Sequence, residues 1–212
     1  NYLNAKLYLF KNLIKKKGSV ITDQLIPEFK KIKKITINKK LKLYALNDKK
    51  NNLQVISHSF KGEAQSFKIK LNNSIQNINL NLIGKIQLKN VLMAIIAAKN
   101  SNIGLNKILN KISKLKPVEG RFEKIGKIKN YSKVILDYAH TPDALKTCLL
   151  NLREQFPGKK ITVLFGCGGN RDQNKRSKMG KIASYFSDKI ILTNDNPRLE
   201  NPQKIRRDIK KG

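Results

Sequence analysis

The sequence predicts an α/β protein with two structural units that meet near residue 116. Before Gly84, apolar and polar residues alternate along several runs, which is typical of an antiparallel sheet with one face in water. After Lys133, short continuous apolar runs alternate with amphipathic segments, which is typical of parallel strands joined by helices. Pro117 and Gly120 lie where the periodicity changes, so the two patterns are assigned to separate units.

The first unit is expected to begin with a helix over residues 2–16, because apolar residues recur there at helical spacing. Gly18 is the expected C-cap of this helix, and residues 20–22 should form a short strand. The alternating runs that predict the antiparallel sheet are Ile35/Ile37, Leu41/Leu43, Phe67/Ile69/Leu71 and Ile78/Leu80/Leu82.

Two helices are expected to complete the first unit, over residues 87–100 and 105–115. The apolar stripe of the first of these helices is predicted to consist of Val91, Ala94, Ile95 and Ala98. The unit is therefore expected to combine helices with antiparallel strands.

The second unit is predicted to contain three strands, each followed by a helix. The strands are expected at 134–136, 161–165 and 190–192, and the helices at 142–155, at 177–187 and from Pro202 onward. Thr141 and Asn201 each precede a proline, a combination typical of a helix N-terminus. This alternation predicts a Rossmann-like parallel α/β domain.

The formal net charge of +31 is compatible with binding to nucleic acid or to an anionic membrane surface. The basic residues are mostly Lys, however, and are spread along the whole chain, while aromatic residues make up only 7%. The Arg clusters and stacking platforms of nucleic-acid-binding proteins are missing. We expect neither nucleic acid nor a membrane as a partner. A basic nucleic-acid-binding protein is the alternative from a different functional class.

Other features of the composition favour a cytoplasmic protein. No apolar run approaches the roughly 20 residues of a membrane helix, and the first residues lack the pattern of a signal peptide. Cys148 and Cys167 form neither a CxxC pair nor a disulfide framework, which suits a reducing compartment. Because the first residue is not Met, the chain is expected to begin inside a longer protein.

Three polar segments each follow one of the predicted strands of the second unit. They are Asp137–Asp143, Gly166–Asp172 and Asn194–Arg198. Each segment alone could be an ordinary turn or a loop ion pair. In open parallel sheets, however, ligands bind beyond the carboxyl ends of the strands. Three such segments at one edge therefore predict a composite pocket.

The residue types in these segments suggest that the pocket holds an amino acid. The glycines of the second segment would let backbone N–H groups approach an anion. Arg171 and Arg198 carry planar guanidinium groups that suit carboxylates, and Asp195 can hold an ammonium group. Two Arg side chains, the carboxylate of Asp195 and an amide side chain are the groups needed to bind both the carboxylate and the ammonium group of an amino acid.

Six segments resemble, in order and spacing, the motifs of the Mur ligases over essentially all 212 residues. The sequences DYAHTPD, GCGGNRD and DNPR, from the three polar segments, are similar to motifs of the members that attach the third residue of the peptidoglycan stem peptide. Residues 118–123, VEGRFE, resemble the hinge motif that opens the C-terminal domain of this family. Residues 2–6, YLNAK, resemble the segment that carries a carbamoylated Lys, and residues 84–98 resemble a nucleotide-contacting helix.

The resemblance implies that residues 1–116 are the C-terminal part of a central, ATP-binding domain. It implies that residues 117–212 are a truncated C-terminal, amino-acid-binding domain. The implied cofactors are ATP and magnesium, and the implied substrates are a UDP-linked muramoyl dipeptide and meso-diaminopimelate. In the family's reaction the γ-phosphate of ATP passes to a substrate carboxylate, and an amine then attacks the acyl phosphate. A monomeric cytoplasmic enzyme is expected.

Three groups of site residues follow when the family's roles are carried over to the matching positions. Lys6 would be catalytic and, as a carbamate, would offer oxygen ligands to magnesium. The residues implied to contact the nucleotide are Asn90, Arg121, Asp137, Tyr138 and His140. The residues implied to contact the incoming amino acid are Arg171, Asp195, Asn196, Pro197 and Arg198.

The sequence departs from the family pattern in places that bear on function. Ile86 and Gln87 stand where the family's helix motif carries Phe and Asn, so only Asn90 is carried over from that helix. The glycine-rich phosphate loop, the uridine-nucleotide-binding domain and the final C-terminal segment are absent from these residues, which alone are expected to be inactive. A lysine-adding or folylpolyglutamate-type ligase is the alternative within the superfamily, and Arg198 favours a substrate with a second carboxylate.

Overall fold

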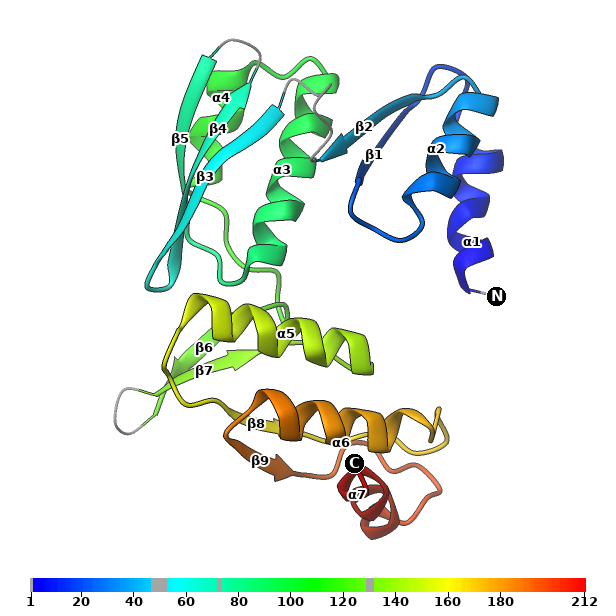
Figure 1. The fold of residues 1–212 in the computed structure, drawn as a ribbon, viewed down its shortest axis with the longest axis vertical. Coiled ribbons are helices and arrows are strands. Elements are labelled where there is room, and N and C mark those ends of the chain that lie inside the picture. The colour runs from blue at the N-terminus through cyan, green and yellow to red at the C-terminus, as the bar shows by residue number, and fades with distance from the viewer. Residues whose placement is uncertain (1, 47–52, 72–73, 129–131) are drawn as a thin grey trace. The chain divides into compact units, whose positions relative to one another are not determined.

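The computed structural model describes residues 2–46, 53–71, 74–128 and 132–212, and the chain divides into two compact units. Unit 1 consists of Asn1–Leu82 and Ile86–Lys116, and unit 2 consists of Ile83–Lys85 and Pro117–Gly212. Figure 1 shows the elements of each unit along the chain. Each unit has its own apolar cores.

The N-terminal part of unit 1 places helices against a pair of parallel strands. Its elements in order are α1 (Tyr2–Tyr8), the π-helical turn η1 (Leu9–Leu13), β1 (Ser19–Asp23), α2 (Phe29–Asn38) and β2 (Lys42–Leu46). β1 and β2 pair in parallel, with α2 as the connection between them. Leu7, Val20 and Ile32 form the buried centre of this part, so α1 and α2 pack on the strands.

The prediction that residues 35–43 belong to an antiparallel sheet was wrong. Ile35 and Ile37 lie in α2, where Ile32 and Thr36 are buried at a spacing of four residues and Ile37 is 66% exposed. The helical periodicity of the whole segment outweighs the short alternation. Leu43 lies in β2, whose described partner is the parallel strand β1.

The second part of unit 1 is the predicted antiparallel sheet with its two helices. β3 (Leu53–Lys61), β4 (Ala64–Leu71) and β5 (Ser74–Leu80) pair in that order, all antiparallel. α3 (Lys85–Asn100) and α4 (Leu105–Ile112) share one apolar core with this sheet. The buried residues of α3 are Leu88, Val91, Leu92, Ile95 and Ile96. Ala94 is exposed, so the buried stripe is rotated from the predicted one.

Unit 2 contains every predicted strand and helix, together with one strand that the sequence did not indicate. Its elements are β6 (Glu123–Lys127), β7 (Lys133–Leu136), α5 (Pro142–Gln155), β8 (Thr162–Phe165), α6 (Lys175–Phe186), β9 (Lys189–Leu192) and α7 (Pro202–Lys210). β8 and β9 pair in parallel, as expected. β7 was expected to extend the parallel sheet, but it pairs antiparallel with the unpredicted β6. β6 holds one large apolar residue, Ile125, and so gives little strand pattern.

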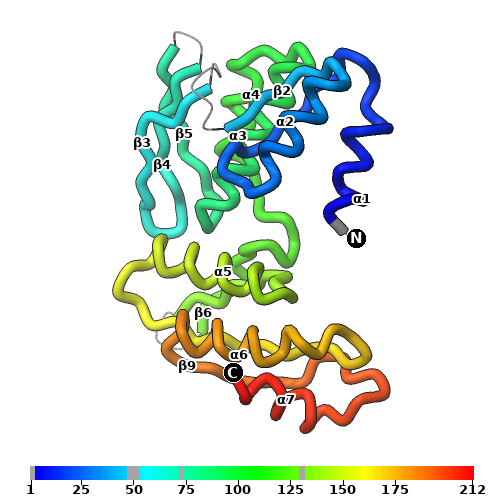
Figure 2. Tube along the Cα trace, turned by 45° about the vertical axis from the view of Figure 1, so that its right-hand side comes forward, coloured from blue at the N-terminus to red at the C-terminus, as the bar shows by residue number. Residues whose placement is uncertain are grey.

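The packing of unit 2 fixes the positions of its loops. α5, α6 and α7 share a core with β8 and β9, built on Leu149, Met179 and Ile209. α5 also packs on the side of β7 through Cys148, which lies beside Phe122 and Ile83. Figure 2 shows α5 and α6 running alongside each other, with α7 next to α6. Because one core holds all three helices, the loops that precede them are placed by the same packing.

None of the helices formed by the described residues has the length and apolar character needed to cross a membrane.

Candidate functional site

The second and third polar segments lie against each other. They leave the neighbouring parallel strands β8 and β9 at the same edge of the sheet. The backbone N–H of Gly169 donates to the carbonyl of Asn196 at 2.9 Å. In the other direction, Nη1 of Arg198 donates to the carbonyl of Gly169 at 2.7 Å. Hydrogen bonds in both directions therefore hold the second segment (the glycine loop, Gly166–Asp172) against the Asp-Asn-Pro-Arg segment.

The glycines of the second segment are required by this close contact. A Cβ on Gly169 would lie 1.8 Å from the carbonyl oxygen of Pro197, and one on Gly166 would lie 2.5 Å from that of Thr193. The sequence had suggested that these glycines let backbone N–H groups approach an anion. In the structure, the N–H of Gly169 donates to the carbonyl of Asn196, so close loop packing accounts for Gly166 and Gly169, and the anion contact stays a prediction for the other N–H groups.

The third segment forms a hydrogen-bonded turn that presents charged side chains. The N–H of Asn196 donates to Asp195 Oδ1 at 2.7 Å, and the N–H of Arg198 donates to Asn196 Oδ1 at 3.1 Å. The N–H of Glu200 closes the turn on the carbonyl of Pro197 at 2.9 Å. Arg198 has φ of +51°, a left-handed conformation that costs energy for a residue with a Cβ. Asp195 and Arg198 are both exposed, so one short turn presents an anionic and a cationic side chain to the solvent.

Arg171, the remaining residue assigned to the amino acid, lies on the glycine loop. It is exposed, and no hydrogen bond or ion pair among the described residues joins it to the turn at 195–198. Its neighbour Asn170 does make this connection, because Asn170 Oδ1 accepts from the N–H of Leu199 at 3.1 Å. Arg171 therefore shares a loop that is fixed to the turn.

The first polar segment forms a second group of side chains with residues of the hinge segment. The Arg121 guanidinium lies 4.5 Å from the centroid of the Tyr138 ring, and the His140 ring is 4.9 Å from the same ring at a steep angle. Asp137 Oδ2 accepts from the N–H of Phe122 at 3.0 Å, which holds the hinge against this segment. Tyr138 is 59% exposed. A cation and an imidazole beside an accessible ring can contact both a planar base and an anion.

Asn90 and Lys6 belong to unit 1. Asn90 is an exposed residue of α3, and its Nδ2 lies 3.5 Å from Gln87 Oε1. Lys6 is an exposed residue of the short helix α1. Four of the five residues assigned to the nucleotide are therefore brought together in unit 2, and Asn90 is placed on a separate unit.

Three charged residues that sequence reasoning did not select connect the polar segments. Lys175, the first residue of α6, donates from Nζ to the carbonyl of His140 at 2.7 Å and so joins the first segment to the helix that follows the second. Arg176 is fully buried and pairs with Glu200 at 2.9 Å. The side-chain hydrogen bond from Arg176, followed by the N–H of Asn170, holds the pKa of Glu200 below its usual value.

The two cysteines are unsuited to nucleophilic chemistry. Burial, and secondarily the charge of Asp137, raises the pKa of Cys148 to about 12. Burial is also the main reason that the pKa of Cys167 is raised, although Cys167 lies within the glycine loop. Because the thiolate is the reactive form, both side chains stay protonated and unreactive near neutral pH.

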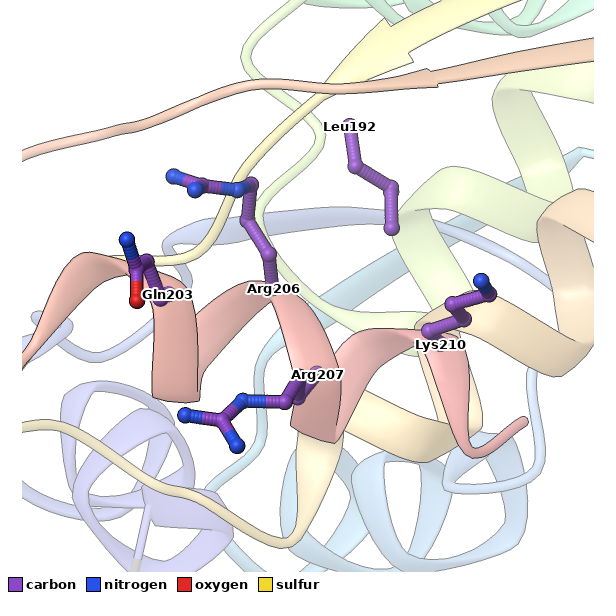
Figure 3. Close-up of a pocket in the computed structure, with 5 residues that line it drawn as sticks. All are labelled: Leu192, Gln203, Arg206, Arg207 and Lys210. Atoms are coloured by element: carbon purple, nitrogen blue, oxygen red, sulfur yellow. The ribbon is translucent and has the colours of Figure 1, made fainter.

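An open hollow of about 390 Å³ lies beside α7, as Figure 3 shows. It is lined by Leu192, Gln203, Arg206, Arg207 and Lys210. None of the residues selected from the sequence lines this hollow. Its only described link to the polar segments is Arg206, which donates to Asn194 Oδ1.

Comparison with protein families assigns almost the whole chain. Residues 1–98 match the family model described as the Mur ligase middle domain. Residues 120–212 match the one described as the Mur ligase glutamate ligase domain.

Curated relatives match most or all of the chain. It is 38% identical over 213 residues to a UDP-N-acetylmuramoyl-L-alanyl-D-glutamate–2,6-diaminopimelate ligase of Rickettsia typhi, covering 100% of this chain and 42% of the relative. It is 44% identical over 144 residues to the ligase of the same name from Fusobacterium nucleatum, covering 68% of this chain and 30% of the relative. The chain therefore spans less than half of the length of these relatives.

Solved structures show the same fold. A structure of a UDP-N-acetylmuramoyl-L-alanyl-D-glutamate–2,6-diaminopimelate ligase has a TM-score of 0.62 at 28% identity, covering 100% of this chain and 43% of that one. A folylpolyglutamate synthase from Thermotoga maritima has a TM-score of 0.74 at 21% identity, covering 95% of this chain and 47% of that one, and shows the fold alone. The two domain matches, in this order along one chain, and a relative that is 38% identical over the whole of this chain establish that the chain belongs to the Mur ligase family.

Proposed function

We propose that this chain serves in an ATP-dependent ligase that joins meso-diaminopimelate to UDP-N-acetylmuramoyl-L-alanyl-D-glutamate during peptidoglycan synthesis. Relatives that bear the name of this activity support the reaction. The observation that carries the choice of amino acid is the turn at 195–198, which presents Asp195 and Arg198 together and is held against the glycine loop. The enzyme is proposed to work as a cytoplasmic monomer.

The reaction forms an amide in two steps. A carboxylate oxygen of the muramoyl dipeptide attacks the γ-phosphorus of ATP, the bond from this phosphorus to the ADP oxygen breaks, and an acyl phosphate forms. The amine nitrogen of diaminopimelate then attacks the acyl carbon, the bond to phosphate breaks, and the nitrogen loses a proton. Phosphorylation is needed because a carboxylate repels the amine's electron pair and oxide is a poor leaving group. Charged groups that stabilise the transferring phosphoryl group contribute most of such catalysis.

The nucleotide is proposed to contact Arg121, Asp137, Tyr138 and His140 of unit 2 and Asn90 of unit 1. In the first group, Tyr138 offers an exposed aromatic surface, and Arg121 and His140 flank its ring. Asp137, whose carboxylate accepts from the N–H of Phe122, suits a ribose hydroxyl, and Arg121 suits a phosphate.

Magnesium is the second proposed cofactor, and the described side chains do not form a complete site for it. No group of three His, Cys, Asp or Glu residues within the described parts of the chain could hold a metal ion. Lys6 is proposed to supply oxygen ligands after its neutral amine has captured carbon dioxide, because a carbamate carries negative charge on oxygen and magnesium prefers oxygen.

Diaminopimelate differs from lysine by a carboxylate at its far end. Arg198 is proposed to bind this group or its twin, since Nη1 alone of its guanidinium is engaged among the described residues. Asp195 and Asn196 would hold the neighbouring ammonium group, Pro197 would shape the turn, and Arg171 would bind a carboxylate. Lysine would leave Arg198 without its carboxylate partner and should bind less well.

The test is steady-state kinetics of Arg198→Ala in the intact protein that carries this chain. Removing one partner of a desolvated ion pair costs enough to weaken binding by roughly 30-fold or more. The KM for diaminopimelate should rise by at least this factor, while the KM for ATP stays nearly constant. Arg207→Ala is the matched control, because Arg207 lies on α7 beside the hollow, and it should change neither constant. Equal weakening of both substrates by Arg198→Ala would mean that Arg198 does not bind the amino acid.

A further inference from the structure

Arg176 is a buried charge between two carboxylates. Its side chain is 0% exposed, and its guanidinium binds both oxygens of Glu200, with Nη1–Oε2 and Nη2–Oε1 distances of 2.9 Å each. Nη1 also lies 3.2 Å from Asp208 Oδ2 on α7. Arg176 belongs to α6, so its side chain joins α6 both to α7 and to Glu200, the residue that closes the turn at 195–198.

Glu200 also hydrogen-bonds to the glycine loop. Its Oε1 accepts from the backbone N–H of Asn170 at 2.5 Å, and its Oε2 lies 3.4 Å from Nε2 of Gln173. Asn170, with φ of +51°, returns the contact by accepting from the N–H of Leu199. Arg176, Glu200 and Asn170 therefore hold the segments on both sides of Arg198 and the loop that accepts its guanidinium.

The geometry of Arg176 indicates more than a contribution to stability. Burying a guanidinium is costly, and a buried ion pair is often no more stabilising than a well-packed apolar pair. Here Nε of Arg176 is also buried without a hydrogen-bond partner in the described structure, which adds to this cost. The bidentate contact with Glu200 instead fixes the orientation of the two side chains relative to each other, because a planar guanidinium and a carboxylate pair in one geometry.

We infer that Arg176 is a positioning residue for the amino acid. It acts through Glu200 to hold Arg198 and the glycine loop in fixed positions relative to each other. This inference rests on the proposed function, in which Arg198 binds diaminopimelate. Arg198 stands in a left-handed conformation, which persists only where surrounding contacts enforce it. Arg176 and Glu200 provide those contacts on the C-terminal side of the turn.

The test compares Arg176→Lys and Glu200→Gln with wild type in the intact protein. Lys keeps the charge but loses the two-pronged geometry, and Gln keeps the shape but loses the charge. Each variant should raise the KM for diaminopimelate at least tenfold, with the KM for ATP unchanged and kcat altered less than threefold. Glu200→Gln is the second variant in case the buried Arg176 site does not tolerate Lys.

Two control variants separate positioning from general stability. Asp208→Asn alters the same network on the α7 side, away from the loops, and should leave the KM for diaminopimelate unchanged. Arg153→Lys removes an arginine that pairs with Asp188 at 2.7 Å and binds the carbonyls of Phe186 and Lys159, elsewhere in unit 2. It should lower the melting temperature without changing that KM.

Amide hydrogen exchange supplies a readout that does not depend on the substrate. The N–H groups of Asn170 and Leu199 should exchange faster in Arg176→Lys and Glu200→Gln than in wild type and in Arg153→Lys. If wild type does not use diaminopimelate, the proposed function fails, and the exchange rates still decide the positioning. The inference is overturned if both variants leave these exchange rates unchanged, or if both lower the melting temperature while the KM for diaminopimelate keeps its wild-type value.

Discussion

At the scale of single residues, the site is defined by side chains whose chemistry is set by their immediate neighbours. Arg198 and Asp195 project from one turn. The turn is held because Asn196 Oδ1 accepts from the N–H of Arg198, and the carbonyl of Gly169 accepts from the Arg198 guanidinium. Arg121 and His140 flank the ring of Tyr138. Each group is held by short-range contacts, so single substitutions should act on one substrate at a time.

Lys6 allows the sharpest test at this scale. In the intact protein, Lys6→Ala should lower the ligase rate strongly, and added short carboxylates should restore part of it by replacing the lost oxygen ligands. Labelled ¹³C-bicarbonate should give a carbamate signal in the wild-type NMR spectrum that is absent from the variant. Lys11→Ala is a suitable control, because Lys11 is another exposed lysine of the same N-terminal segment. Near wild-type turnover of Lys6→Ala would remove the carbamate from the mechanism.

The sequence identified the residues of the turn and missed the residues that hold it. Asp195 and Arg198 stand out because they follow a predicted strand within an Asn-Pro motif. Arg176 and Lys175 lie in a helix of a chain with 45 basic residues, and nothing in their pattern distinguishes a buried arginine from an exposed one. Their roles depend on Glu200 and His140, which are 24 and 35 residues away in the chain.

At the scale of elements, local signals were reliable where several agreed. Thr141 and Asn201 cap α5 and α7 as expected, with Oγ1 accepting from Ala144 and Oδ1 from Gln203 and Lys204. One error has a local cause and the other a tertiary one. The alternation of Ile35 and Ile37 predicts a strand within α2, although the burial of Ile32 and Thr36 follows a helical period. β6 was missed because its pairing with β7, rather than its own apolar residues, makes it a strand.

Unit 2 is also held together by carboxylates, which predicts its response to acid. Asp188 has its pKa lowered mainly by the N–H of Ile161 and by Arg153, and Glu200 mainly by Arg176. Their usual values are 3.8 and 4.5. Because the folded pKa values lie lower, the stabilisation is complete above the usual values and is lost as the pH falls through the folded ones.

The melting temperature should therefore change little between about pH 7 and pH 5.5 and should fall progressively below about pH 4.5. Asp188→Asn should melt lower than wild type at neutral pH and show a shallower acid dependence. Thermal unfolding followed by circular dichroism across this pH range is the measurement. A melting temperature that rises on acidification below pH 4.5 would contradict the assignment of these carboxylates.

At the scale of the molecule, fold and function are supported by different observations. The fold is shared with a folylpolyglutamate synthase at a TM-score of 0.74, so it does not separate the ligases from one another. The proposed function rests instead on the order of the two family matches along the chain and on a relative, 38% identical over this chain, that bears the name of a diaminopimelate-adding ligase. In the proposed function, the choice of amino acid rests on a few residues in one turn of unit 2.

The most direct test of this function compares two amino acids with the intact wild-type protein. With ATP and UDP-N-acetylmuramoyl-L-alanyl-D-glutamate present, amide product and ADP should form in equal amounts. The value of kcat/KM should be at least roughly 30-fold higher for meso-diaminopimelate than for lysine, because only diaminopimelate offers Arg198 a second carboxylate. A kcat/KM for lysine that equals or exceeds that for diaminopimelate, or the absence of ATP-dependent amide formation with both, would contradict the proposed function.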